Sequence, residues 1–222
     1  MNNSIILEAI NISKFYEDGQ VKAVDDISLQ VYTGEVLIIG GPSGSGKSTL
    51  LHLLGGLDLP SSGKVYFKGK SIQDVYGSKG FRVKNIGFVF QAFYLWQNLN
   101  VMENVMLPLM ELPLTRRQRI SRTKEIIEEV GLTDKIKAQV KLISMGQRQR
   151  VAVARALVAN PSVIFADEPT GSLDSCNKEN ILQLLRRFNR QNKVTVVMVT
   201  HESPAVEYFD RKIQLLDGRI CV

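Results

Sequence analysis

One short segment constrains the fold of this chain more than any other. Gly41 to Ser48 reads GPSGSGKS and matches the phosphate-binding loop pattern G-x-x-x-x-G-K-[ST] at every fixed position. The apolar run Val36 to Ile39 precedes it, and a helical pattern from Thr49 to Leu57 follows. Because glycines let backbone N–H groups converge on phosphate oxygens at a helix N-terminus, this order predicts a nucleotide-binding α/β core.

The loop also assigns roles to side chains. We expect Lys47 to contact the β- and γ-phosphates of ATP and the Ser48 hydroxyl to ligate Mg²⁺. The predicted nucleotide-binding set around the loop is Gly41, Pro42, Ser43, Gly44, Ser45, Gly46, Lys47, Ser48 and Thr49.

A second apolar run, Val163 to Ala166, ends in two adjacent carboxylates. A carboxylate at a strand tip near a phosphate loop can hold Mg²⁺, a role we assign to Asp167. Glu168 is then expected to polarise the attacking water as a general base. The two segments together predict an ATPase.

The remaining patterns indicate an α/β fold with a parallel sheet. Three nearly continuous apolar runs are typical of strands buried on both faces, and helical patterns separate them. The runs are Val36 to Ile39, Val163 to Ala166 and Val194 to Val199, and one intervening helix has Ile181, Leu184, Leu185 and Phe188 on its apolar face. The opening third predicts further strands at Ile5 to Ile12, Val24 to Val31, Glu35 to Gly40 and Lys64 to Phe67, with turn signals at Asp18-Gly19, Thr33-Gly34 and Ser62-Gly63.

The middle of the chain, about residues 95–160, predicts a mainly helical lobe inserted in this core. Thr115 to Val130 is rich in charge with a narrow apolar stripe, and a second helix is predicted from Gly146 to Ala159, before Pro161. With no linker or internal repeat, we expect residues 1–222 to form a single domain with insertions.

Charge and cysteine content limit the kinds of partner and metal that we expect this chain to bind. A net charge of +6 favours an anionic partner, such as a nucleotide, a nucleic acid or a membrane surface. Cys176 and Cys221 lack other ligands at metal spacing, which predicts no zinc site. No apolar stretch is long enough for a spanning helix, and the start lacks a secretory pattern.

In these motifs and their order, the chain resembles the nucleotide-binding subunits of ABC transporters over nearly its whole length. The specific mark is Ile143 to Arg150, ISMGQRQR, which is similar to the signature L-S-G-G-Q-x-Q-R. The resemblance implies that Ser144, Gly146 and Gln147 meet the γ-phosphate bound by a partner subunit.

The same resemblance gives roles to four other residues. Gln91 matches a metal and water ligand, Asp174 lies in the Ser172-Leu173-Asp174 loop, and His201 matches the switch histidine that contacts the γ-phosphate. Tyr16 matches the aromatic residue that stacks on adenine, although Phe15 beside it leaves simple packing open.

The implied fold is a phosphate-loop core of the RecA-like type with an N-terminal antiparallel β-subdomain and a helical subdomain. The implied activity is ATP hydrolysis that drives a separate membrane permease, with two ATP-binding subunits, alike or different, closing on ATP at the cytoplasmic face of the membrane. Three segments resemble the ATPases of lipoprotein-releasing, macrolide-exporting and antimicrobial-peptide-resistance systems: Phe88 to Gln91, Leu99 to Leu109 and Ala166 to Asp174.

Met145 departs from the resemblance, because it stands where the first signature glycine is expected. We expect its bulk to slow closure and hydrolysis, which keeps a regulatory ATP-binding module as an alternative function. A nucleic-acid-associated ATPase is the weaker alternative, since no long coiled-coil or zinc-bearing insertion is present, and no nucleic-acid partner is expected. Phe93, Tyr94 and Leu95 are the predicted apolar contact for the permease, while Met102, Met106 and Met110 are predicted mainly as core.

Overall fold

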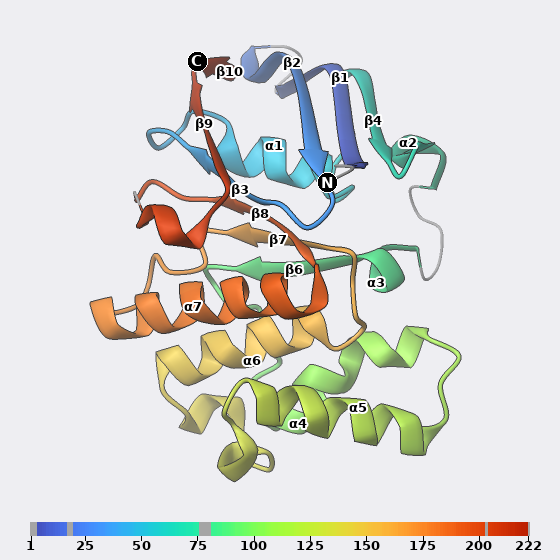
Figure 1. Ribbon diagram of the computed structural model, residues 1–222, viewed down its shortest axis with the longest axis vertical. Helices are drawn as coiled ribbons and strands as arrows, with labels where there is room; N and C mark the ends of the chain where they lie inside the picture. Colours follow the sequence, from blue (N-terminus) through green and yellow to red (C-terminus); the bar gives the residue numbers. More distant parts are fainter. Residues whose placement is uncertain (1–3, 17–19, 76–80, 203, 222) are drawn as a thin grey trace. The chain divides into compact units, whose positions relative to one another are not determined.

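The computed structural model describes residues 4–16, 20–75, 81–202 and 204–221. The chain divides into two compact units, residues 1–78 with 189–222 and residues 79–188 (Figure 1). The predicted helical lobe at 95–160 belongs to the second unit, which also contains two strands.

The first unit has an antiparallel sheet with the strand order β2-β1-β4-β5. Its strands are β1 (Ile5–Tyr16), β2 (Val21–Tyr32), β4 (Ser62–Phe67) and β5 (Lys70–Ser71), and helix α2 (Ile72–Val75) follows. Strands β1 and β2 extend further than the apolar runs predicted, because their irregular ladder continues to the pair Tyr16 and Val21. The predicted turn at Asp18-Gly19 lies outside the described residues.

The turn predicted at Ser62-Gly63 is wrong, since both residues belong to β4. The register of β4 against β1 shifts between Ile10 and Ser13. Gly63 has φ +79°, and a Cβ there would lie 2.3 Å from the Asn11 carbonyl oxygen. The glycine therefore permits an irregular ladder rather than a chain reversal.

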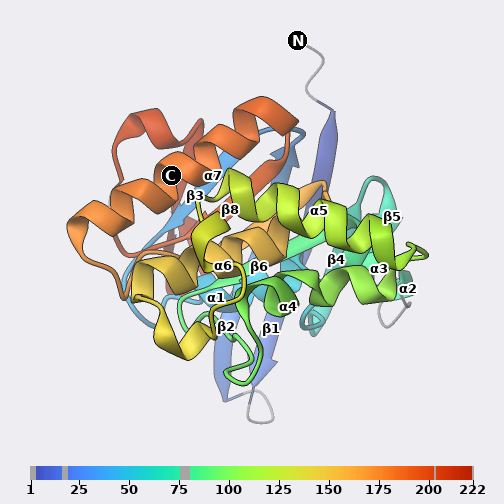
Figure 2. The same ribbon diagram turned by 90° about the horizontal axis from the view of Figure 1, so that it is seen from below.

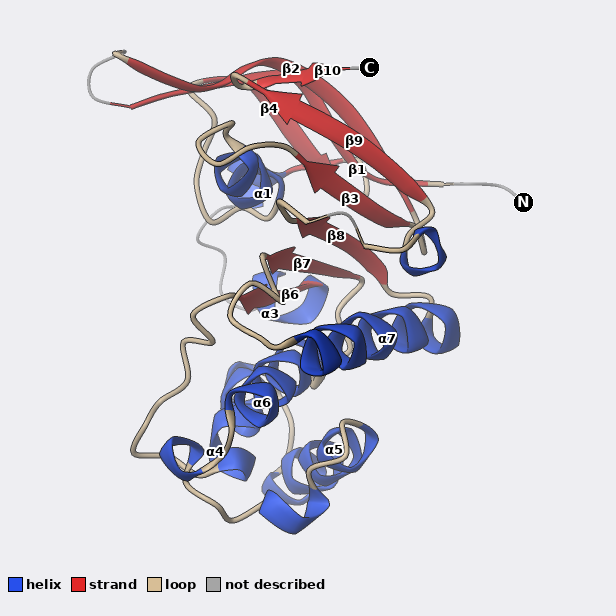
Figure 3. Ribbon diagram, turned by 90° about the vertical axis from the view of Figure 1, so that its left-hand side faces the viewer, coloured by secondary structure: helices blue, strands red, loops and turns tan. Residues whose placement is uncertain are grey.

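The second sheet of this unit has three parallel strands and an antiparallel edge strand. Strand β3 (Val36–Gly40) pairs with β8 (Thr195–Val199) on one side and β9 (Arg211–Leu216) on the other, and β10 (Arg219–Cys221) runs antiparallel to β9. A short 3₁₀ helix, η5 (Val206–Tyr208), precedes β9. Helix α1 (Lys47–Leu54) contacts β1, β2 and β8, so it packs against strands of both sheets (Figure 3).

The second unit pairs β6 (Ile86–Phe90) with β7 (Val163–Asp167) in parallel. Helices α4, α5 and α6 contact one another, and α6 also contacts β6 (Figure 2). The helices of this region are α3 (Phe81–Asn85), α4 (Val101–Met106), η2 (Leu107–Glu111), α5 (Arg116–Glu129), η3 (Thr133–Lys135), η4 (Val140–Leu142), α6 (Met145–Leu157) and α7 (Ser175–Asn192), whose last turn belongs to the first unit.

The apolar patterns lie where they were predicted. β3, β7 and β8 are buried along their apolar runs, and the predicted face of α7 is buried from Ile181 to Phe188. Helix α5 begins at a capping box, in which Thr115 accepts from the Gln118 N–H and Gln118 accepts from the Thr115 N–H. Its stripe is buried at Ile127 and half-buried at Ile120.

Two expectations for apolar side chains are corrected. Leu95 is 8% exposed and therefore belongs to the core, whereas its neighbour Trp96 is 66% exposed. The methionines do not form one buried stripe, because α4 ends at Met106 before Pro108, and Met110 lies exposed at the end of η2.

Candidate functional site

The predicted phosphate loop lies between β3 and α1, as expected. Gly46 is the residue before the helix, with φ 94° in the left-handed region, and no side chain caps the first turn. A Cβ on Gly46 would lie 2.0 Å from the Ala23 carbonyl oxygen, so only glycine fits. The N–H groups of this turn, together with the positive end of the helix dipole, are therefore free of an acidic cap and suited to an anion.

Two side chains of the loop are buried. The Lys47 ammonium donates a 2.7 Å hydrogen bond to the Pro42 carbonyl oxygen, which holds it over the loop. The Ser45 hydroxyl is buried and has no hydrogen-bond partner among the described residues. A buried cation beside an unsatisfied hydroxyl fits a site that receives phosphate oxygens.

His201 lies near the same edge of the parallel sheet. Ile39 and Val199 are paired across β3 and β8. Gly41, the first residue of the phosphate loop, and His201 each lie two residues after one of these partners. The Thr200 N–H also donates to the Ile39 carbonyl oxygen at 3.2 Å. The structure therefore places the exposed His201 beside the loop within the first unit.

Tyr16 is also held in this unit, close to the start of α1. Its hydroxyl donates to Asp58 Oδ2 at 2.8 Å, and it forms a second hydrogen bond with Thr49, the residue after the loop. Burial raises the pKa of the Tyr16 phenol, and the bond to Asp58 raises it further. Phe15 is equally exposed but contacts the Lys22 ammonium instead, so the two rings have different surroundings.

The second unit brings the predicted carboxylates and Gln91 together. Phe90 and Asp167 are paired across β6 and β7, which sets Gln91 beside Glu168 at the ends of adjacent strands. A Cβ on Gly171 would lie 2.8 Å from Gln91 Nε2 and 3.4 Å from Glu168 Oε2, so both side chains converge on this glycine. Glu168 has φ 44°, a strained conformation that is common at functional sites.

The signature segment begins α6 with a capping box. Ser144 Oγ accepts from the Gln147 N–H, and Gln147 Oε1 accepts from the Ser144 N–H. A Cβ on Gly146 would lie 2.3 Å from Asn177 Oδ1, so this glycine permits the first turn of α6 to approach α7.

Met145 occupies the first position of α6 and is 49% exposed. Its φ is not positive, so the backbone at this position does not need a glycine. The expected backbone conflict is therefore absent within the chain, because a helical first turn accommodates any side chain that points to solvent.

Asp174 begins α7. Its carboxylate accepts hydrogen bonds from the Asn177 N–H at 2.9 Å and from Asn177 Nδ2 at 2.7 Å. These two bonds lower the pKa of the Asp174 carboxyl. Since Asn177 also lies against Gly146, Asp174 orients the residue that contacts the signature turn.

Two residues of α6 escaped the sequence reasoning. Gln149 is fully buried and donates from Nε2 to the Pro169 carbonyl oxygen at 2.6 Å, which ties α6 to the segment after Glu168. Arg155 donates to the carbonyl oxygens of Phe93 at 2.6 Å and Tyr94 at 2.5 Å, and burial lowers the pKa of its guanidinium. For Gln149, its position within the signature run was a signal in the sequence that could have identified it; Arg155 had no such signal.

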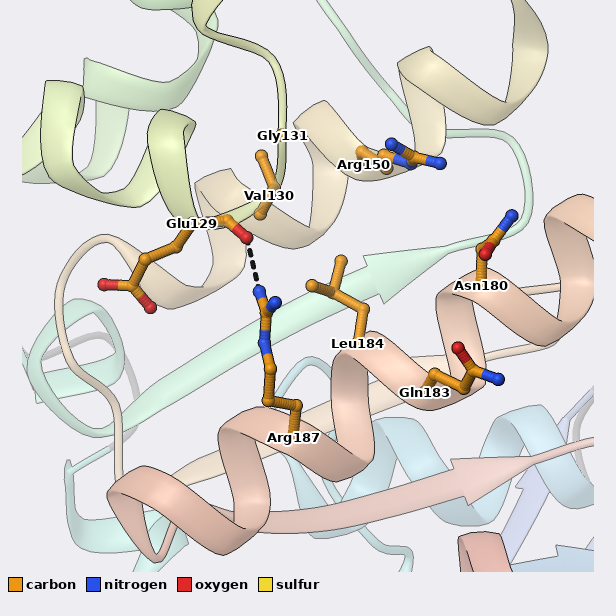
Figure 4. A pocket seen from close by; sticks show the side chains of 8 residues that line it. All are labelled: Glu129, Val130, Gly131, Arg150, Asn180, Gln183, Leu184 and Arg187. Carbon is orange, nitrogen blue, oxygen red and sulfur yellow. Dashed lines mark hydrogen bonds between the residues drawn. The ribbon is translucent and has the colours of Figure 1, made fainter.

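A polar pocket of about 430 Å³ also lies in the second unit, between α7, α6 and the end of α5 (Figure 4). Arg187 donates to the Glu129 carbonyl oxygen there, so it caps the C-terminus of α5. None of the predicted nucleotide or metal residues lines it; the lining residues are Glu129, Val130, Gly131, Arg150, Asn180, Gln183, Leu184 and Arg187.

Two kinds of feature are absent from the described residues. No helix in the described part is both long and apolar enough to cross a membrane. No cluster of three or more His, Cys, Asp or Glu side chains that could hold a metal occurs there. Ser48, Gln91 and Asp167, the predicted Mg²⁺ ligands, offer the oxygen donors that this ion prefers, although Ser48 belongs to the first unit and the other two to the second.

Several known proteins are similar to this chain over most of its length. Residues 24–171 match the family described as ABC transporter. The chain is 43% identical over 219 residues to an uncharacterized ABC transporter ATP-binding protein of Methanocaldococcus jannaschii, with 97% of each covered. It is 41% identical over 221 residues to the lipoprotein-releasing system ATP-binding protein LolD of Colwellia psychrerythraea, covering 98% of this chain and 86% of that protein.

Its fold is also similar to a solved structure. The ATP-binding cassette MJ0796, described as a dimer in a post-hydrolysis state bound to ADP and Pi, superimposes with a TM-score of 0.88 at 38% identity and 96% coverage of both chains.

Proposed function

Because this chain belongs to the ABC transporter family and is an ATP-hydrolysing subunit of it, we propose that two such subunits close on MgATP and thereby drive a membrane partner. The phosphate loop and His201 of one subunit would face Ser144, Gly146 and Gln147 of the other. The dimer described for MJ0796 supports this arrangement.

The open first turn of α1 is the observation that carries the proposal. It leaves the loop N–H groups and the Lys47 ammonium for phosphate oxygens, and the buried Ser45 hydroxyl is available to them. Ser48 and Asp167 would hold Mg²⁺, which supplies positive charge at the phosphate oxygens when bound. Gln91, beside Glu168, would contact both the Mg²⁺ and the attacking water.

Glu168 is the proposed general base. Its position after β7 and beside Gln91 gives it a partner that can fix a water molecule. The Glu168→Gln variant should bind ATP with unchanged affinity and lose at least about 100-fold in turnover, within the range of general-base contributions. Phosphate release under saturating MgATP measures this, and Glu128→Gln on the exposed side of α5 serves as a matched control. Wild-type turnover in Glu168→Gln would remove the assignment.

The same variant tests ATP-driven association. If ATP joins two subunits and hydrolysis separates them, Glu168→Gln should form a dimer with ATP but remain a monomer with ADP. Light scattering after gel filtration distinguishes the two. A monomer under both conditions, while calorimetry shows bound ATP, would contradict closure of two copies of this chain.

The surface at Tyr94 and Trp96 is the proposed contact for the membrane partner. Both residues are 66% exposed, and Phe93 and Tyr94 have positive φ values of 60° and 46°. Two hydrogen bonds from Arg155 hold these strained residues, so the backbone that carries the exposed Tyr94 is fixed to the signature helix α6. A partner bound here could therefore act on α6.

By the resemblance to LolD, that partner is a permease of a lipoprotein-releasing or related system, and it would hold the ATPase at the cytoplasmic face of the membrane. Tyr94→Ser with Trp96→Ser should reduce co-purification with detergent-solubilised membrane proteins while ATP binding stays intact. Leu142→Ser, an equally exposed apolar site on η4, is the control. Undiminished co-purification would move the contact elsewhere.

A further inference from the structure

Tyr16, at the end of β1, is fixed by three neighbouring side chains of the first unit. Its hydroxyl donates to Asp58 Oδ2 at 2.8 Å, and it also hydrogen-bonds with Thr49. The Lys14 ammonium lies 5.0 Å from the centroid of its ring. One edge and one face of the ring are thus occupied, while the residue as a whole remains 38% exposed.

Asp58 links these contacts into one network. Its Oδ1 accepts from Lys14 Nζ at 2.7 Å and from the Leu59 N–H at 2.7 Å, and Lys14 also donates to the Leu59 carbonyl oxygen at 2.8 Å. Partial burial acts to raise the pKa of Asp58, but its hydrogen bonds from Lys14, Tyr16 and Leu59 lower it overall. Asp58 is therefore an ionised acceptor at neutral pH, and the phenol is a neutral donor.

We propose that Asp58 and Lys14 are positioning residues that hold the Tyr16 ring as the surface on which the base of the bound nucleotide stacks. This inference rests on the proposed nucleotide site. Thr49 immediately follows Ser48, so its hydrogen bond places the phenol next to the phosphate loop. Lys14 covers one face, and the base takes the other. A ring fixed before binding loses less conformational freedom when the base arrives.

Stacking on this ring should strengthen the binding of a nucleotide but not the binding of phosphate groups alone. A ring face interacts with the π-face that every base has, but it offers nothing to phosphate oxygens. Asp58 and Lys14 should therefore contribute to the affinity for ATP and not to the affinity for inorganic tripolyphosphate, which has the phosphates alone. A residue that merely stabilised the fold would affect both ligands alike.

Calorimetric titrations with MgATP and magnesium tripolyphosphate test this on the complete chain. Tyr16→Ala should weaken ATP binding roughly 5- to 100-fold, the range for loss of one base–aromatic stack. Asp58→Ala and Tyr16→Phe should each weaken it roughly 3- to 10-fold, the range for the net contribution of one hydrogen bond. Tripolyphosphate affinity should stay at the wild-type value in all three.

Asp58→Ala should add no loss in a Tyr16→Ala background, because it acts through the ring. Asp134→Ala is the matched control, since Asp134 is an exposed carboxylate paired with Lys135 in the other unit. Equal losses for both ligands, an additive double variant, or wild-type ATP affinity in Asp58→Ala would each overturn the inference. The phosphate-loop assignment is tested separately by Lys47→Ala, which should weaken both ligands.

Discussion

Helix α1 and helix α6 each begin in a segment predicted to meet phosphate, but their first turns are built differently. At α1 the preceding residue is Gly46 in a left-handed conformation, and no side chain caps the helix. At α6 Ser144 and Gln147 cap each other's backbone N–H groups. The first turn of α1 is open to an anion and is fixed by backbone contacts, whereas the first turn of α6 is stabilised by its own side chains.

This difference teaches how the two segments tolerate substitution. In the phosphate loop a Cβ on Gly46 would meet a backbone carbonyl, which cannot move without moving β2. In the signature turn a Cβ on Gly146 would meet the end of the Asn177 side chain. Residue 145 lies in solvent at the helix start, which explains how methionine can occupy a position where the resemblance predicts glycine.

The comparison predicts its largest effect at Lys47, because phosphate binding at the open first turn of α1 depends mainly on this cation and on backbone N–H groups. Lys47→Ala should weaken ATP binding about 100-fold, or about 2.7 kcal/mol, the scale of one or two charge-assisted hydrogen bonds. Calorimetric titration measures this, with the exposed Lys137→Ala as the control. Unchanged affinity would mean that phosphate binds elsewhere.

The next effect is on folding stability within the same loop. Gly46→Ala should lower the free energy of unfolding by at least about 2 kcal/mol, since it combines a positive φ with a backbone clash. Gly44→Ala, with φ +80° but no atom within 4 Å of its Cβ, should lose only about 1 kcal/mol. Urea denaturation monitored by circular dichroism compares the pair. Equal losses would show that backbone strain, and not the contact with Ala23, dominates.

The smallest effect is expected at the signature turn. Met145→Gly should change the free energy of unfolding by less than about 1 kcal/mol, because residue 145 has a helical φ and an exposed side chain. It should raise the ATPase rate by up to about tenfold, or 1.4 kcal/mol in the barrier, when the membrane partner is present. Met110→Gly is the control for an exposed methionine. A rate that does not rise would show that the methionine does not hinder closure.

Much of the fold followed from local patterns. The buried runs of β3, β7 and β8 and the apolar face of α7 were evident, because strands and helices bury residues at different periods. Irregular backbone was not evident, as Gly63 shows: the same dipeptide can reverse a chain or form a bulge, and the choice depends on the partner strand.

The sequence by itself determined the phosphate loop, the paired carboxylates and the buried strands β3, β7 and β8, because these depend on residue types at fixed short spacings. Tertiary structure alone decided which side chains meet. Asp58 reaches Tyr16 across 42 residues of sequence, and Arg155 reaches Phe93 across 62. Such contacts depend on how distant segments pack, so spacing along the chain carries no record of them.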